Sequence, residues 1–168
     1  MAQFQSVSPE ELCENPFHLI GKEWMLVTSG NREKFNTMTA SWGGVGVLWN
    51  KPVCFVFVRP SRYTYEFIEQ NDTLSLSFFE ESKRDVLKLC GSKSGREIDK
   101  VSACGLTPFF TDDNCVAFED ARLVLTCKKL YSDDMKEEHF LDPALLQNYS
   151  SGDYHRVYVC EILSVIKK

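Results

Sequence analysis

The chain has 168 residues, of which 43% are hydrophobic and 26% charged, and its formal net charge is −5. This balance is typical of a globular domain that buries a sizeable core, and it argues against disorder. The sequence has no block of Lys and Arg that would suit a phosphate backbone or an anionic membrane surface. We therefore expect a single domain over residues 1–168, with neither nucleic acid nor membrane as partner.

The amino terminus, MAQFQSVSPEEL, has no basic stretch followed by an apolar run, which a secretory signal requires. No apolar run approaches the roughly 18 residues of a membrane span. The seven cysteines are widely spaced and include no C-x-x-C pair, so the sequence predicts neither a disulfide framework nor a metal site. We expect a cytoplasmic protein with reduced, mostly buried thiols. Cys90, beside a glycine and a polar loop, is the thiol for which another role stays open.

Local patterns predict strands with a few short helices. Ser8, Pro9 and Glu11 suit the start of a helix that ends near residue 15, because serine can cap and Glu11 can complete a capping box. Apolar or alternating stretches predict strands at residues 24–28, 35–42, 52–59, 73–79, 116–127 (two halves of one long or bent strand) and 156–162. Helical spacing occurs at residues 63–70, 85–90, 96–103 and 143–148. Six strands without regular strand–helix alternation favour an antiparallel barrel or sandwich.

The segment RPSRYT, residues 59–64, leaves a predicted strand and enters a predicted helix. Ser61 suits the N-cap, and the free N–H groups and dipole of a helix start favour an anion. Arg59 and Arg62 add guanidinium groups that match phosphate oxygens, and Ser61 and Thr64 add hydroxyls. The segment predicts a phosphomonoester site. The alternative is a capped helix with two solvated arginines.

Two other polar segments offer binding groups. In CGSKSGR, residues 90–96, glycines and serines can form a backbone nest for an anion beside Lys93 and Arg96, although a flexible surface loop would look the same. In NTMTASWGG, residues 36–44, small polar residues alternate along a strand. That edge could hydrogen-bond a planar heterocycle while Met38 and Trp42 cover it, or it could be a strand with one solvated face.

These segments, in this order, resemble the flavin reductase-like family, specifically its flavoredoxin-type branch. The resemblance runs from about residue 35 to residue 162. The elements that carry it are residues 36–42, 59–64, 77–79 and 90–96 with Asp99 and Lys100, then 105–108 and 152–155. It implies a mainly β fold, a six-stranded Greek-key FMN-binding split barrel with flanking helices. It also implies a homodimer with FMN near the subunit interface.

The resemblance further implies which residues hold FMN. The isoalloxazine and ribityl groups would lie along Asn36, Thr37, Met38, Thr39, Ala40, Ser41 and Trp42. The phosphate end would be held by the segment that contains Arg59, Ser61, Arg62, Tyr63 and Thr64. Ser77 and Phe78 would face the flavin ring. The second loop, which begins at Cys90, would approach with Ser94, Arg96 and Lys100, from the same or the other subunit.

The implied activity is an oxidoreductase that moves reducing equivalents from NAD(P)H through FMN to free flavin or another acceptor. With no GxGxxG sequence, a nicotinamide would dock on the flavin without a Rossmann domain. Two positions depart from the family pattern: Cys160, where relatives usually have glycine, and Tyr154, which separates Gly-Asp from the potential nicotinamide contact His155. Two alternatives remain, an FMN-containing electron-transfer protein reduced by a partner such as a ferredoxin, and a barrel without flavin used only for dimerisation.

Overall fold

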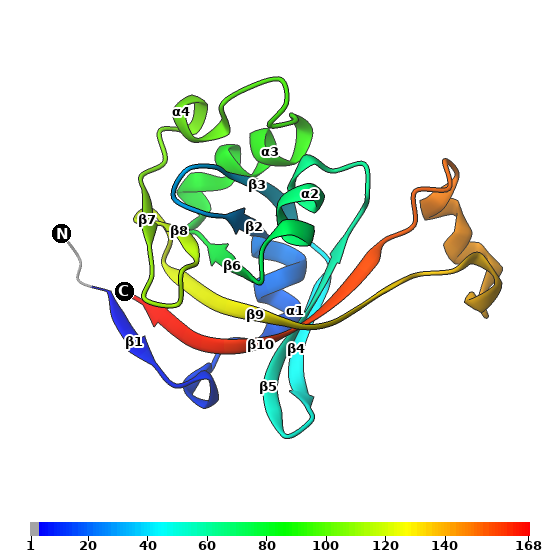
Figure 1. Cartoon of the computed structure of the whole chain (residues 1–168), viewed down its shortest axis with the longest axis horizontal. Helices are drawn as coiled ribbons and strands as arrows, with labels where there is room; N and C mark the ends of the chain where they lie inside the picture. Colours follow the sequence, from blue (N-terminus) through cyan, green and yellow to red (C-terminus); the bar gives the residue numbers. More distant parts are fainter. Residues whose placement is uncertain (1–3) are drawn as a thin grey trace.

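The computed structural model describes residues 4–168, and one antiparallel sheet of eight strands dominates it (Figure 1). The strands of this sheet are β1 (Gln5–Val7), β2 (Met25–Gly30), β3 (Phe35–Ala40), β4 (Gly43–Leu48), β5 (Lys51–Val58), β6 (Thr73–Phe78), β9 (Leu123–Asp134) and β10 (Arg156–Lys167). They lie in the order β3-β2-β6-β9-β10-β5-β4, and β1 pairs with β10. β7 (Pro108–Phe110) and β8 (Val116–Phe118) form a separate two-stranded sheet.

The predicted mainly β fold is confirmed, but the expected count of six strands is wrong because the large sheet has eight, and it is not closed. The sequence analysis did not predict β4, because its residues, GGVGVL, are rich in glycine, which has a low strand propensity. It nevertheless pairs along its length with β5 in a hairpin. The turn residues Trp49 and Asn50 have φ of 53° and 57°, as a two-residue turn with both central residues left-handed requires.

The long strand predicted over residues 116–127 is also wrong. β8 and β9 belong to different sheets, and a turn separates them in which the Ala121 N–H donates to the Phe118 carbonyl at 3.0 Å. β9 then continues to Asp134 and β10 to Lys167, well past the predicted ends. Beyond the sheet, the chain between them, residues 135–155, reaches away from the rest of the molecule (Figure 1). We call residues 135–155 the arm.

The helices are short. They are α1 (Pro16–His18), α2 (Tyr63–Gln70), α3 (Arg84–Ser92) and α4 (Lys100–Cys104), with 3₁₀ segments at Pro9–Glu11, Glu81–Lys83, Glu137–His139 and Pro143–Tyr149 and a π-helical segment at Leu19–Glu23. α2 has the predicted bounds. The helix predicted from Ser8 is only a 3₁₀ turn, because Asn15 starts a separate helix by accepting from the Phe17 N–H. α4 begins later than predicted because the Asp99 carboxylate caps it. No helix of residues 4–168 is long and apolar enough to cross a membrane.

The two faces of the curved sheet bury two separate clusters. The main cluster includes the fully buried Leu125 and Tyr158 together with Ile68 of α2. The second lies against α3 and β8 and includes Leu26, next in sequence to Val27 of the main cluster. Successive residues of a strand point to opposite faces, so this alternation is what a sheet covered on both sides requires. α2 packs on β2 and β3, and α3 packs on β3, the strand at one end of the sheet.

Candidate functional site

The end of β3 and the residues after it line a hollow of about 200 Å³, which we call the Trp42 hollow. Its walls are Met38, Thr39, Ala40, Ser41, Trp42, Phe57, Arg59, Arg62 and His155. The Trp42 ring is half exposed, and its centroid lies 5.4 Å from that of the His155 ring. The hollow therefore combines an aromatic wall with two guanidinium groups.

His155 comes directly before β10 and is buried, with only 7% of its surface exposed. Its Nδ1 lies 2.7 Å from the hydroxyl of Tyr149 in the arm. Burial, with a smaller contribution from the nearby Arg59 charge, lowers the pKa of His155 to about 4. His155 is consequently neutral near pH 7, and it contributes a hydrogen-bonding ring rather than a cation.

A second hollow of about 220 Å³, the Ser94 hollow, adjoins the first. Its walls are Met38, Ser61, Arg62, Tyr63, Thr64, Ser92, Lys93, Ser94, Gly95, Glu97 and Lys100. Hydroxyl and cationic groups dominate this lining, in contrast to the aromatic lining of the Trp42 hollow. Met38 and Arg62 line both hollows, so the aromatic hollow and the cationic hollow are neighbours that share these two side chains.

Arg62 stands between the two hollows and is held by the end of α3. Its guanidinium donates to the Gly91 carbonyl at 2.9 Å and to the Cys90 carbonyl at 3.4 Å. Burial lowers the pKa of Arg62 below its ordinary value, yet an arginine keeps its charge. Arg62 itself occupies the N-cap position of α2. The prediction that Ser61 is the N-cap is therefore wrong.

Arg59 and Ser61 hold the base of the arm instead of facing a vacant anion site. Arg59 donates to the Asn148 carbonyl at 2.8 Å and to the Asp153 carbonyl at 3.0 Å. Its guanidinium lies 4.9 Å from the centre of the Tyr149 ring. The Ser61 hydroxyl donates to the Asp153 carboxylate. The two arginines of RPSRYT therefore differ: Arg59 binds the arm, whereas Arg62 binds carbonyls at the end of α3.

Lys100 joins the edge of β3 to the end of α3. Its ammonium donates to the Thr37 carbonyl at 2.8 Å and to the Cys90 carbonyl at 2.9 Å. Burial lowers the pKa of Lys100 to about 8. The hydroxyls of the neighbouring threonines are also engaged, since Thr37 pairs with Thr28 and Thr39 donates to the Leu87 carbonyl. Thr39 can therefore serve a ligand mainly through its backbone, whereas the hydroxyl and the carbonyl of Thr37 are both engaged within the protein.

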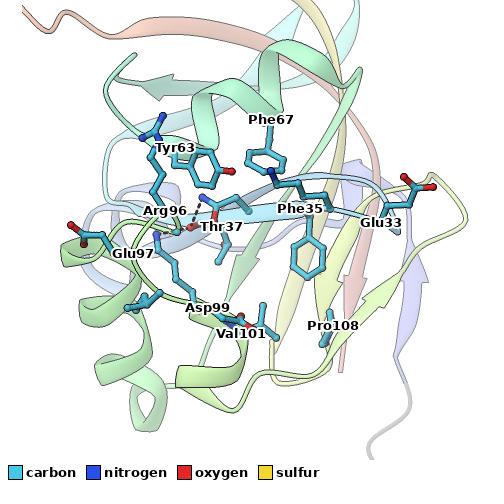
Figure 2. Close-up of a pocket in the computed structure, with 15 residues that line it drawn as sticks. Glu33, Phe35, Thr37, Tyr63, Phe67, Arg96, Glu97, Asp99, Val101 and Pro108 are labelled. Carbon is cyan, nitrogen blue, oxygen red and sulfur yellow. Dashed lines mark hydrogen bonds between the residues drawn. The ribbon is translucent and has the colours of Figure 1, made fainter.

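A further hollow of about 620 Å³ is lined by residues of β3, of α2 and of the loop before α4 (Figure 2). Five of the predicted residues line it: Asn36, Thr37, Tyr63, Arg96 and Lys100. The Arg96 guanidinium lies 4.5 Å from the centre of the Tyr63 ring and pairs with Glu66. Arg96 therefore does not line the Ser94 hollow, although the resemblance assigned Arg96 and Ser94 to the same site.

Gly95 forms the wall between these two hollows. A Cβ at this position would lie 2.0 Å from Oδ1 of Asn36, so only glycine lets the loop approach β3 this closely. The Asn36 amide in turn donates to the Thr64 hydroxyl at 2.8 Å. Asn36 and Thr64, which the resemblance assigns to different parts of FMN, are hydrogen-bonded to each other.

Three predicted residues line none of these hollows. Ser77 and Phe78 are buried in the sheet, and among residues 4–168 the Ser77 hydroxyl has no hydrogen-bond partner. The Cys90 side chain is buried, and only its carbonyl meets Arg62 and Lys100. Within the same residues, no group of three or more His, Cys, Asp or Glu side chains could hold a metal ion.

Sequence reasoning did not assign roles to Phe57, Lys93 and Asp153. Phe57 lies in an apolar strand, and its neighbours in sequence do not indicate whether its side chain lines a hollow or belongs to the core. Lys93 was recognised only as a cation near a possible anion nest. The carboxylate of Asp153 contacts Ser61 across 92 positions of sequence, so no local signal could have revealed that contact.

The chain has relatives of known structure. Residues 17–167 match the family described as "Flavin reductase like domain". A flavoredoxin from Methanosarcina acetivorans is 22% identical with a TM-score of 0.67, over 87% of this chain and 68% of that chain. An FMN-binding domain of a flavin reductases-like enzyme from Shewanella baltica is 17% identical with a TM-score of 0.71, over 98% and 77%. The NADH:FAD oxidoreductase SgcE6 from Streptomyces globisporus is 14% identical with a TM-score of 0.66, over 87% and 75%. At these identities the structures demonstrate a common fold. No curated protein sequence matches the chain.

The buried His155 generates a prediction about pH. Its pKa is 6.5 in an ordinary setting and about 4 in the folded chain, so between these values the unfolded chain binds a proton that the folded chain does not. The stability that neutral His155 contributes is complete above pH 6.5 and falls as the pH is lowered towards 4. His155→Gln should therefore give a shallower loss of unfolding free energy over this interval, measured by urea denaturation.

His139→Gln serves as the control, because His139 is exposed in the arm and should keep the wild-type slope. Equal slopes for the wild type and His155→Gln would show that burial of this ring does not govern the acid sensitivity.

Proposed function

The protein belongs to the flavin reductase-like domain family, and on this basis we propose that it binds FMN and passes reducing equivalents through it to a flavin or another acceptor. One observation carries the proposal. The Trp42 hollow and the Ser94 hollow adjoin at Met38 and Arg62. FMN likewise joins a planar, largely apolar ring system to a phosphate, so an aromatic hollow beside a cationic one suits both ends of the molecule.

The residues present fit a phosphate in the Ser94 hollow. Arg62 is partly buried there, where a charge-assisted hydrogen bond to a phosphate oxygen is stronger than in water. Lys93 and the hydroxyl of Ser94 lie in the same wall. Arg59 and Ser61 already bind the arm, so we assign the main share of phosphate binding to Arg62 and not to the whole RPSRYT segment.

The Trp42 hollow would take the isoalloxazine ring. Trp42, Phe57 and Met38 supply apolar contact, and the backbone at the end of β3 supplies hydrogen-bonding groups. Bound FMN would supply the hydride and electron chemistry, so the protein needs no acid or base for the reductive step. Neutral His155 would place a hydrogen-bonding nitrogen at the rim, where a nicotinamide could approach, and we propose NAD(P)H as the donor.

A second candidate is an FMN-containing electron-transfer protein that a partner protein reduces. The acidic net charge of −5 and the insertion of Tyr154 before His155 favour it. An anaerobic titration of the purified yellow protein separates the two candidates. Rapid bleaching of the flavin absorbance by NADH or NADPH is the expected result. Bleaching by reduced ferredoxin alone would exclude NAD(P)H activity, and a colourless protein that fails to bind added FMN would favour the dimerisation module.

Arg62 provides the sharpest test of the phosphate assignment. Arg62→Ala should weaken FMN binding by about tenfold or more, because a charge-assisted hydrogen bond to phosphate contributes roughly 1.5–3 kcal/mol. Arg84→Ala is the matched control. Its guanidinium also donates to two backbone carbonyls, those of Lys22 and Glu23, but it lines neither hollow. Fluorescence titration of the apoprotein measures both affinities, and an equal loss in the two variants would count against the assignment.

We also propose that the protein is a homodimer in which the arm contacts the second copy. The arm extends away from the sheet (Figure 1), and Leu141 within it is 97% exposed. Leu145 is 48% exposed on the same arm. A second copy that covered these leucines would remove apolar surface from water, which favours association. A second copy is the occupant we favour, because Arg59 fixes the arm beside the Trp42 hollow and would bring that copy close to the flavin.

Replacing both leucines with aspartate should shift the protein from dimer to monomer in light scattering coupled to size exclusion, since two charges would be buried in the interface. Phe17→Asp is the control, because Phe17 is 87% exposed outside the arm. A wild-type protein that is monomeric at all concentrations tested would refute the dimer.

A further inference from the structure

Two thiols meet at the base of the loop that lines the Ser94 hollow. Cys90 lies near the end of α3 and Cys104 at the end of α4, and their sulfur atoms are 3.8 Å apart. Cys90 is fully buried, whereas Cys104 is partly exposed. Another close pair, Cys54 and Cys127, lies wholly inside the main cluster, where a solute cannot reach it. The pair at the loop is therefore the one that an oxidant from solution can reach.

We propose that Cys90 and Cys104 form a reversible disulfide, an oxidative modification site that restrains the loop beside the Ser94 hollow. The sulfur atoms need to approach by somewhat less than 2 Å to reach the bonded distance of about 2.05 Å. α3 and α4 already pack together, and Cys104 is the last residue of its helix, where a small displacement disturbs few backbone hydrogen bonds.

The oxidant we assign is hydrogen peroxide. The sulfur of Cys104 attacks the peroxide O–O bond, which gives a sulfenic acid and releases one water. The sulfur of Cys90 then attacks the sulfenic sulfur, so that the S–S bond forms and a second water leaves. Two thiols lose two protons and two electrons, and one peroxide is reduced to two waters. Oxidation of a reduced flavin by oxygen yields peroxide, so this source rests on the proposed function.

The surroundings assign the order of these steps. Burial keeps Cys90 away from peroxide and raises its pKa to about 12, so Cys90 is not the thiol that attacks first. In the second step its proton leaves with the hydroxyl of the sulfenic acid as water. The charged groups that face Cys90 are Lys100 and Arg62, which would stabilise the thiolate as it attacks. Cys104 is the thiol with access to solvent, which the first step requires.

The bond would act on the loop through Cys90. The carbonyl of this residue accepts from Lys100 and Arg62, and the chain that follows it supplies Ser92, Lys93 and Ser94 to the hollow. A cross-link across 14 positions reduces the conformations open to the intervening chain. We therefore expect the oxidised protein to release a ligand from the Ser94 hollow more slowly. This consequence, unlike the disulfide itself, depends on the proposed FMN site.

Peptide mapping by mass spectrometry tests the disulfide. After treatment with hydrogen peroxide, the wild type should yield one cross-linked peptide pair containing Cys90 and Cys104, two hydrogens lighter than the sum of its parts and restored by dithiothreitol. Cys104→Ser should yield no such pair. Cys13→Ser should yield the wild-type pair, since Cys13 is an exposed thiol elsewhere. Peroxide that oxidises Cys13 of the wild type but leaves Cys90 and Cys104 unlinked would overturn the proposal.

The rate of FMN release tests the effect on the loop. Oxidised wild type should release FMN at least about threefold more slowly than reduced wild type, followed by recovery of free-flavin fluorescence on dilution. Cys104→Ser should show no difference between the two treatments. Equal rates in a wild type whose disulfide is confirmed would overturn the restraint. A chain that binds no FMN in either state would instead refute the proposed function, and the peptide map would still decide whether the disulfide forms.

Discussion

The buried ammonium of Lys100 is the interaction on which the candidate site depends. β3 lies at one end of the large sheet, so one edge of its backbone has no neighbouring strand. Lys100 binds the Thr37 carbonyl on β3 and the Cys90 carbonyl at the end of α3, and thereby fixes α3 and the loop after it against the strand. A buried charge is costly unless it is hydrogen-bonded, and the lowered pKa of Lys100 reflects that cost. The two hydrogen bonds of Lys100 show that polar contacts, and not apolar packing alone, hold α3 against the edge of β3.

The arm determines which groups remain for a ligand. Arg59 and Ser61 bind carbonyl and carboxylate groups of residues 148–153, so the acidic Asp153 satisfies donors that would otherwise suit a phosphate. This leaves Arg62 as the guanidinium that joins the two hollows. His155 lies between the arm and the Trp42 hollow, since its ring contacts Trp42 and its Nδ1 lies 2.7 Å from the hydroxyl of Tyr149 in the arm. In the proposed function and the proposed dimer, Arg59 would thus couple cofactor binding to subunit contact.

The sequence could predict elements whose signals are local. The spacing of residues 63–70 predicted α2 with its bounds, and the alternation of residues 35–42 predicted β3. The sequence could not predict β4, because its glycines weaken the strand pattern. Pairing with β5 is what holds these residues in a strand. The ordered motifs indicated which segments converge, yet the partner of each side chain depended on distant residues. Arg59 is the clearest case, because its acceptors lie 89 and 94 positions away and no residue near it in the sequence indicates them.

The loop between α3 and α4 is held at its base and near its middle, and this decides which part of it can respond to a ligand. At the base, Lys100 and Arg62 bind the carbonyls of Cys90 and Gly91. Near the middle, Gly95 lies so close to the Asn36 amide that a side chain here would have to displace either that amide or the loop. The stretch between these points, residues 92–94, carries the hydroxyls and the lysine that line the hollow, and its backbone is also hydrogen-bonded: the Lys93 N–H donates to the Leu89 carbonyl at 3.0 Å, and the Ser94 carbonyl accepts from Glu97 at 3.0 Å. The Ser92 hydroxyl donates to the Leu89 carbonyl and the Ser94 hydroxyl accepts from the Arg96 N–H. The Lys93 side chain is therefore the group of this stretch that could respond most readily to a bound phosphate.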